Sequence, residues 1–365
     1  NVAIGYQALQ EADAGSDGTV AIGYKAGKAQ TNPGNQGSVF IGKEAGQGVV
    51  NSATVMIGWE AGAGYSGIGK AEAVTLIGHR AGYQANDDAI NNTGVGYAVF
   101  YNQTEGAQNT AVGRNAGFKN TTGDNNTLLG YNTNGPSTGQ QNTAVGSQAL
   151  SDIDAGSTSL DSDNNTAIGY KSMGGTWANA KSEWNTAVGS SAMQAALNAA
   201  NSNTAMGNQA LYLLTSGDEN VAIGANAGLK IQDGSYNSLL GSYAGQYATG
   251  SYNTFMGYKA GEGGTTSAPF SSGQYNTALG YQALKGFTTG DNNVAIGYEA
   301  LTAATTAPAN TVLGNYAGHD ITTAGYNTLI GYGTGQRLVT ATSTNNQHNT
   351  YVGHQAGALS TGYDN

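Results

Sequence analysis

The chain repeats one short phrase, Asn-Thr-Ala-Ile-Gly-Tyr-x-Ala-Gly or a close variant, twenty times between Asn1 and Gly353. The first glycine of this phrase, called the repeat Gly below, recurs at intervals of 16 to 23 residues. This period is too short for a helical hairpin and is typical of one coil of a β-solenoid. The repeat therefore predicts an all-β fold, a parallel β-solenoid (β-roll) of twenty coils that forms one continuous domain over residues 1–365. Because the chain starts and stops inside its own repeat, we expect it to be a fragment of a longer protein.

The composition agrees with a repetitive extracellular or virion protein. Gly accounts for 58 of the 365 residues and charged residues for only 10%, well below the usual quarter. The net charge of −10, with scattered cations, argues against a nucleic-acid partner. The absence of Cys excludes disulfides and thiolate metal sites, and no apolar run approaches the roughly 20 residues of a membrane-spanning helix.

Two positions of the repeat predict backbone structure. Four residues before the repeat Gly, sixteen of the twenty coils have Asn, which predicts a ladder of stacked amides that bond turn backbone groups from coil to coil. The exceptions are Thr19, Ser38, Thr54 and Val74, so we expect a weaker ladder in the first quarter. The repeat Gly itself is expected at a backbone bend or a close approach that no Cβ would permit. Representative structural repeat residues are Asn109, Val112, Gly113, Asn126, Leu129, Gly130, Asn142, Val145, Gly146, Asn220, Ile223, Gly224, Asn293, Ile296 and Gly297.

The residues directly before the repeat Gly form the predicted strand. The position one before it is always Ile, Val, Leu or Met, and the position three before it is Val, Thr or Ser. These two positions share a face by the period of two and are expected to face the core. The position two before the Gly is also apolar, and we predict that it forms a seam with neighbouring copies of the chain, since a strand apolar on both faces is buried on both. The predicted seam residues are Phe40, Met56, Leu76, Leu128, Leu239, Phe255, Val312, Leu329 and Tyr351.

Candidate binding residues lie mainly in the segments that vary between coils, the longest of which occupy about 151–164, 262–275 and 336–348. Trp177 and Trp184 are candidate ligand contacts. Tyr follows the repeat Gly in nine coils, either as a glycan-binding stripe or as a half-exposed packing position, which the mixed residues of that column favour. An acidic loop could hold Ca²⁺, although a plain solvated loop is the simpler interpretation. Its residues are Asp152, Asp154, Asp161 and Asp163. No catalytic set recurs, so neither an enzyme nor a bound cofactor is expected.

The Asn-Thr-Ala-Ile-Gly-Tyr-x-Ala-Gly phrase resembles the repeat of phage tail fibres, and its Asn-x-Ala-Ile/Val-Gly core is similar to the head repeat of trimeric autotransporter adhesins. The resemblance covers nearly the whole chain and implies a side-by-side homotrimer of β-rolls. It implies a structural fibre shaft of a phage tail or capsid fibre, located on the virion and involved in host attachment. The alternative is a bacterial cell-surface adhesin that binds host or matrix ligands through its lateral face and loops. In either case a cell-surface receptor or glycan is the expected partner besides the chain itself.

A third class, an ice-binding solenoid, requires a flat, exposed array of Thr. The Thr-rich position three before the repeat Gly is regular enough, but we expect it to face inward. The sequence therefore disfavours ice binding.

Overall fold

The computed structural model describes residues 1–11, 18–29, 37–49, 53–65, 73–86, 88–134, 137–151, 161–175, 177, 180–338 and 348–359. The chain divides into two compact units, Asn1–Trp184 and Asn185–Asn365. Each unit is built from ten coils, and each coil contributes one strand of three residues that ends directly before its repeat Gly. Helices are absent from the described residues.

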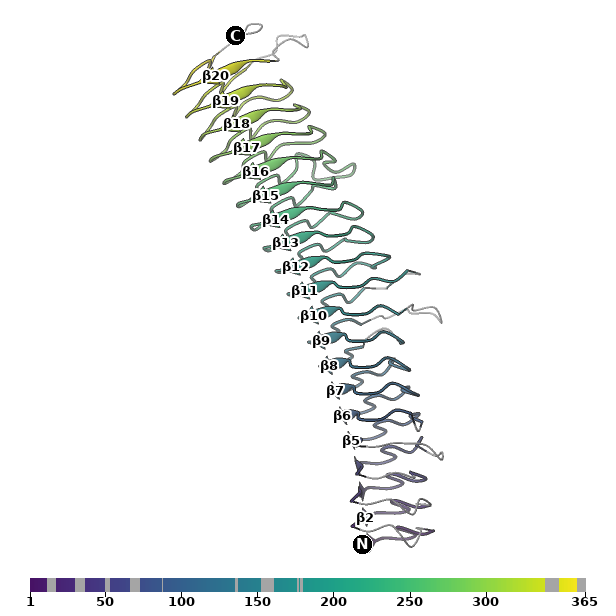
Figure 1. Ribbon diagram of the computed structural model, residues 1–365. Coiled ribbons are helices and arrows are strands. Elements are labelled where there is room, and N and C mark those ends of the chain that lie inside the picture. Colours follow the sequence, from purple (N-terminus) through teal and green to yellow (C-terminus); the bar gives the residue numbers. More distant parts are fainter. Residues whose placement is uncertain are drawn as a thin grey trace. The chain divides into compact units, whose positions relative to one another are not determined.

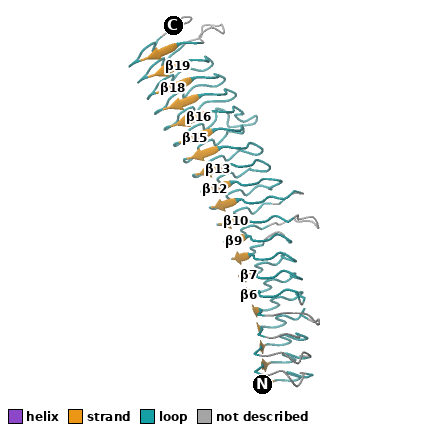
Figure 2. Ribbon diagram, viewed as in Figure 1, coloured by secondary structure: helices purple, strands orange, loops and turns teal. Residues whose placement is uncertain are grey.

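The first unit contains ten strands: β1 (Val2–Ile4), β2 (Val20–Ile22), β3 (Val39–Ile41), β4 (Val55–Ile57), β5 (Thr75–Ile77), β6 (Thr93–Val95), β7 (Thr110–Val112), β8 (Thr127–Leu129), β9 (Thr143–Val145) and β10 (Thr166–Ile168). The second contains β11 (Thr186–Val188), β12 (Thr204–Met206), β13 (Val221–Ile223), β14 (Ser238–Leu240), β15 (Thr254–Met256), β16 (Thr277–Leu279), β17 (Val294–Ile296), β18 (Thr311–Leu313), β19 (Thr328–Ile330) and β20 (Thr350–Val352). Within each unit the strands stack along one side and the loops extend to the other (Figures 1 and 2).

All described strand pairs are parallel and in register. In β2 and β3, for example, Val20 lies opposite Val39, and Ala21 opposite Phe40. Because every coil pairs in this way, each position of the repeat becomes a column of stacked side chains. The predicted all-β, parallel β-solenoid is therefore confirmed.

The middle residue of each strand points into the core. The prediction that the first and third residues face the core is therefore wrong. Ala21, Phe40, Met56 and Phe255 have no exposed surface within a single chain. The predicted seam is therefore wrong for Phe40, Met56, Leu76, Leu128, Leu239, Phe255, Val312 and Leu329, which are at most 2% exposed. Tyr351, in β20, is half-buried. A side chain already enclosed by its own coil has no surface left to offer a second copy.

A size relation between two positions shows how the thin interior is filled. The position four after the repeat Gly faces the middle strand residue of the same coil. Where that middle residue is large, as in Leu329, the later position is Gly335, and a Cβ there would lie 2.7 Å from the Leu329 side chain. Where it is small, the later position is a buried Leu in some coils, as in Ala205 with Leu211, and Gly in others, as in Ala21 with Gly27. A Cβ at Gly27 would lie 2.9 Å from Phe40 and 3.0 Å from Leu9, so in such coils large side chains of the neighbouring coils fill the interior.

The predicted Asn ladder is present in both units. The Asn220 side chain donates from Nδ2 to the carbonyl oxygen of Gly234 at 2.8 Å. Its Oδ1 accepts the backbone N–H of Asn237 at 3.0 Å, and Asn237 repeats the pattern toward Asn253. In the first quarter Asn1 Oδ1 accepts the N–H of Thr19 at 2.8 Å, but the Ser38 hydroxyl accepts the N–H of Thr54 at the longer distance of 3.4 Å. Each buried amide thus satisfies backbone groups in two places.

Replacing one ladder residue is expected to destabilise its unit strongly. Asn220→Ala leaves the N–H of Asn237 and the carbonyl of Gly234 without their partners, at about 1–3 kcal/mol for each buried group. We expect a fall of about 3 kcal/mol or more in the free energy of unfolding, measured by urea denaturation followed by circular dichroism. Asn208→Ala is the matched control, because the Asn208 amide makes only an exposed contact of 3.3 Å. Equal losses for the two variants would contradict the ladder's role.

The repeat Gly lies at a close approach between coils, as predicted. Gly207 has φ of +136°. A Cβ at this position would lie 2.6 Å from both the carbonyl carbon and the oxygen of Gly224. Both the backbone conformation and the spacing of the coils therefore require Gly here.

Candidate functional site

The most extensive surface feature is the outer face of the strands, formed by the first and third residue of each strand and called the strand face below. The third residues Leu240, Met256 and Leu279 are each 43% exposed. These are the columns that the sequence analysis assigned to the core. The assignment is wrong because the middle residue of each strand fills the interior, which leaves its two neighbours on the opposite side.

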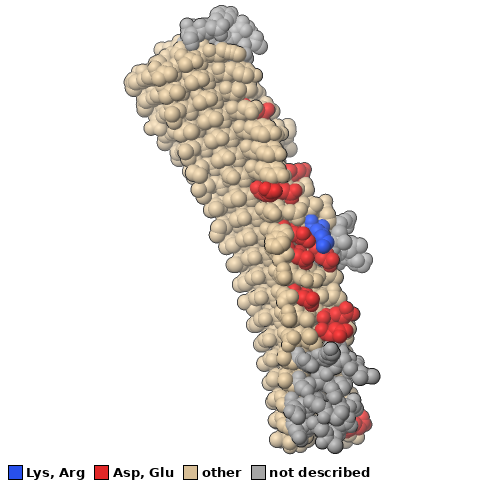
Figure 3. All heavy atoms as spheres, in the orientation of Figure 1, with Lys and Arg blue, Asp and Glu red and all other residues tan. Residues whose placement is uncertain are grey.

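The strand face carries no charged side chain in any of the twenty strands, and its third-position column is apolar throughout. Its third-position column consists of Ile, Val, Leu and Met, and its first-position column of Thr, Val and one Ser, Ser238. In β5–β10 the first position is Thr without interruption. Figure 3 shows the acidic side chains of the visible surface gathered on the loop side. The loops thus hold the charge while the strand side has none.

The strand face is large for an uncovered surface. Ten coils at about 4.8 Å and a width of three residues at about 3.3 Å give roughly 500 Å² in each unit. The largest apolar patch of a typical monomer is about 300–600 Å² and is often functional. Each unit therefore carries a candidate interaction surface.

Aromatic side chains flank the strand face two residues further along each coil. The Tyr281 ring stacks on Tyr258 with ring centres 5.5 Å apart and on Tyr298 with ring centres 5.0 Å apart. A sugar would need an open ring face, but both faces of Tyr281 are occupied by these neighbours. Of the two interpretations of this column, the geometry favours packing over glycan stacking.

A second aromatic column, which the sequence analysis missed, lies directly before the ladder Asn. Tyr252 stacks on Tyr236 at 5.0 Å and on Tyr275 at 4.9 Å, with interplanar angles of 8° and 7°. The three rings are about half exposed. Their recurrence one residue before Asn in consecutive coils was the available signal.

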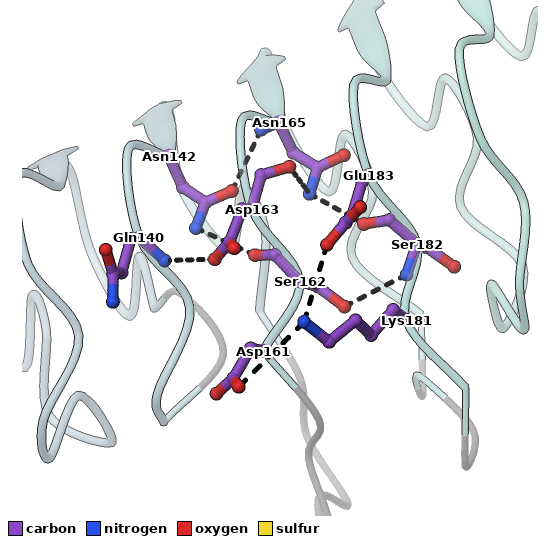
Figure 4. A network of polar contacts seen from close by, with 9 residues as sticks. All are labelled: Gln140, Asn142, Asp161, Ser162, Asp163, Asn165, Lys181, Ser182 and Glu183. Atoms are coloured by element: carbon purple, nitrogen blue, oxygen red, sulfur yellow. Dashed lines mark hydrogen bonds and ion pairs between the residues drawn. The ribbon is translucent and has the colours of Figure 1, made fainter.

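The candidate calcium loop is only partly described. Asp152 and Asp154 lie outside the described residues. Asp161 pairs with Lys181 at 3.9 Å, and the Asp163 carboxylate accepts the backbone N–H of Gln140 at 2.7 Å (Figure 4). Over the described part of the chain, no group of three His, Cys, Asp or Glu side chains is arranged to hold a metal ion. The described half of the loop therefore connects coils.

The bond made by Asp163 recurs elsewhere, always from the position six before the repeat Gly. Asp124, Asp218 and Asp291 each accept the N–H of the equivalent residue one coil earlier, at 2.7, 2.7 and 2.6 Å. This column was not recognised from the sequence, although the shared spacing of these Asp residues was visible. These hydrogen bonds account for the acidic residues of the loops and do not require a bound cation.

The two candidate tryptophans differ in environment. The Trp177 indole N–H donates to the carbonyl of Met173 at 3.3 Å, which holds the half-buried ring against its own loop. Trp184 is 62% exposed, at the last residue of the first unit. Of the two, Trp184 has the larger surface open to a ligand.

The described residues contain no helix of the length and apolarity that a membrane span requires. No family model matches the chain, and no significant match to a curated protein is found. The strand face and the loops on the opposite side are therefore the candidate functional surfaces of the chain.

Proposed function

We propose that the chain is the shaft of a fibre, of the kind found in phage tail or capsid fibres, assembled from three copies and serving host attachment. The observation that carries the proposal is the uncharged strand face with its apolar third-position column, which repeats in every coil of both units. A shaft needs an identical contact at every level, and this surface offers one.

The strand face suits contact with copies of the same chain. Stacked coils repeat at about 4.8 Å in every copy, so one row of side chains can match another along its length. No charge has to be desolvated, which removes the main cost of burying a surface. The roughly 500 Å² in each unit, from a spacing of about 4.8 Å per coil, compares with about 800 Å² per partner in a standard stable interface. A closed, symmetric assembly would cover the face in every copy.

The number three rests on the resemblance to trimeric adhesin heads and not on the geometry of one chain. The alternative proposal, a bacterial trimeric surface adhesin, uses the same assembly. It differs in placing ligand binding on the lateral face and loops of the solenoid itself. The loops lie opposite the strands and would stay accessible in either case (Figure 1).

The solution mass tests the assembly. Light scattering on residues 1–365 is expected to give three times 36.9 kDa. The physical reason is that covering the apolar third-position column removes it from water in every coil. A monomer that stays soluble over a hundredfold range of concentration would refute the shaft assembly.

Ice binding is the second candidate, because the Thr column faces outward and not inward as the sequence analysis assumed. In β5–β10 six Thr residues stack in register, from Thr75 to Thr166. Ice binding requires this face to be open, whereas the fibre requires it to be covered. Thermal hysteresis by a monomer would favour the ice-binding function, and its absence together with a trimeric mass would favour the shaft.

A further inference from the structure

The insertion at 262–275 builds a pocket that the regular coils lack. The backbone N–H groups of Gly263 and Gly264 donate to the carbonyls of Lys285 and Phe287, at 3.0 and 2.6 Å. On the other side of the insertion, Ser271 exchanges backbone bonds with Tyr247 and Thr249, at 3.0 and 2.7 Å. The loop is therefore fixed to the coils before and after it.

The pocket beneath this loop has a volume of about 510 Å³. Its side chains come from four successive coils and the insertion, and the glycines at 263, 264 and 286 leave room between them. The lining side chains are Tyr247, Lys259, Glu262, Thr266, Lys285 and Thr302. This volume is that of a small-molecule site and exceeds what an inorganic anion needs.

Two cations in the pocket face one carboxylate. The Lys259 ammonium lies 3.0 Å from the Glu262 carboxylate, and its hydrogen bond to Glu262 raises the pKa of Lys259. The Glu262 side chain is 10% exposed, so Lys259 compensates a nearly buried charge. Lys285 stands 3.9 Å from the same carboxylate, beyond hydrogen-bond distance, with its side chain 37% exposed.

Lys285 is thus a second positive charge at a site whose carboxylate already has a partner. The whole chain carries a net charge of −10, so local positive charge is unusual here. An ammonium group with unused donors attracts an anionic ligand and forms charge-assisted bonds with it.

The other lining groups restrict the kind of anion. Phosphate sites commonly use backbone N–H groups, but those of Gly263 and Gly264 already bond to carbonyl groups. Thr266 and Thr302 add hydroxyls, and Tyr247, whose ring stacks on Phe270 with ring centres 6.3 Å apart, adds an apolar wall. Carboxylate, hydroxyl and apolar C–H groups occur together in sugar acids.

We propose that this pocket binds the carboxylate-bearing sugar residue of an acidic glycan, with Lys285 pairing with the carboxylate and Thr266 and Thr302 bonding to its hydroxyls. The proposal rests on the host-attachment part of the proposed function and names the class of receptor group recognised. It does not depend on the number of copies in the fibre.

The test is calorimetric titration of residues 1–365 with 3′-sialyllactose and a glucuronate-terminated disaccharide, using lactose as the neutral probe. We expect at least one acidic sugar to bind in the millimolar range or tighter, and lactose at least tenfold more weakly. Lys285→Ala should weaken the binding about tenfold or more, as loss of a charge-assisted bond predicts, whereas Lys285→Arg should retain it. Lys119→Ala, which removes the same charge in the other unit, is the matched control.

Glu262→Gln is a second variant with the opposite sign, since it releases Lys259 from its partner and should tighten acidic sugar binding. The proposal would be overturned by no binding of either acidic sugar at 20 mM, by equal binding of lactose, or by full binding in Lys285→Ala. Light scattering on the same samples reports the assembly separately. A trimer that binds no acidic sugar would refute the pocket alone, and a monomer that binds one would refute the shaft alone.

Discussion

Two glutamates placed on the strand face, Leu240→Glu with Leu279→Glu, are expected to convert the assembled protein into monomers that keep their fold. Both side chains are 43% exposed in a single chain, so the coil can accept the charges. In the proposed trimer the same positions would be buried against other copies, where each unpaired carboxylate would cost several kcal/mol. We expect the mass to fall from three times 36.9 kDa to 36.9 kDa, with an unchanged circular dichroism spectrum.

A charge placed in the neighbouring core column is expected to unfold the protein instead of dissociating it. Phe255→Glu puts a carboxylate where the native ring has no exposed surface, so we expect its coils to unfold and not merely to dissociate. Gln232→Glu with Gln274→Glu adds the same charge on exposed loops and should leave both mass and fold unchanged. An unaltered mass in the Leu240→Glu, Leu279→Glu protein would remove the strand face from the interface.

Alanine at an internal repeat Gly is expected to cause one of the largest losses of stability available to a single methyl group. At Gly207 the added Cβ would lie 2.6 Å from the Gly224 carbonyl, well inside van der Waals contact. The backbone φ of +136° adds strain of about 1–3 kcal/mol for any side chain. Because coils stack at a spacing fixed by their hydrogen bonds, the clash can be relieved only by opening the ladder. We expect Gly207→Ala to lose at least about 4 kcal/mol in urea denaturation.

Gly353 in the last described coil separates the two causes of this loss. Its φ is +131°, close to that of Gly207, but a Cβ there would meet nothing nearer than 4.0 Å. Gly353→Ala should therefore show only the backbone strain, about 1–3 kcal/mol. If both variants lost the same amount, the close approach between coils would not be the reason for Gly at this position.

Features that depend on one coil and its next neighbour were predictable. Asn four residues before the repeat Gly led to the amide ladder seen at Asn220 and Asn237. The repeat Gly led to the close approach seen at Gly207. Both follow from stacking identical positions in register, which repetition alone ensures.

The direction in which the strands face was predicted wrongly, and the reason is physical. Alternation along a strand places the side chains of Phe255 and Met256 on opposite faces, but it does not show which face lies inside the coil. Both columns are apolar, and the larger aliphatic residues of the third position were taken for the core. The coil is in fact so thin that Ala often suffices as its middle strand residue, and Ala21, Ala205 and Ala295 have no exposed surface.

One sequence signal could have corrected the error. In several coils a large middle residue is followed six positions later by Gly, as in Leu329 and Gly335, and a small one by Leu, as in Ala205 and Leu211, although Ala21, Ala111 and Ala222 are followed by Gly. Compensation of volume between two positions indicates that they fill the same space. The strands themselves could be recognised without this relation, from the apolar residues directly before each repeat Gly.

The sequence by itself determined the coil number, the parallel register and the positions of Asn and Gly, because these depend on local spacing and on backbone groups that every repeat shares. Only the tertiary structure decided which apolar columns are enclosed and which are exposed, and that the 262–275 insertion lines a charged pocket. Those outcomes depend on how each coil closes on itself and on contacts such as Lys285 with Glu262, 23 residues apart along the chain. Spacing within one repeat carries no information about that closure, whereas the folded coil leaves room for only one set of side chains inside.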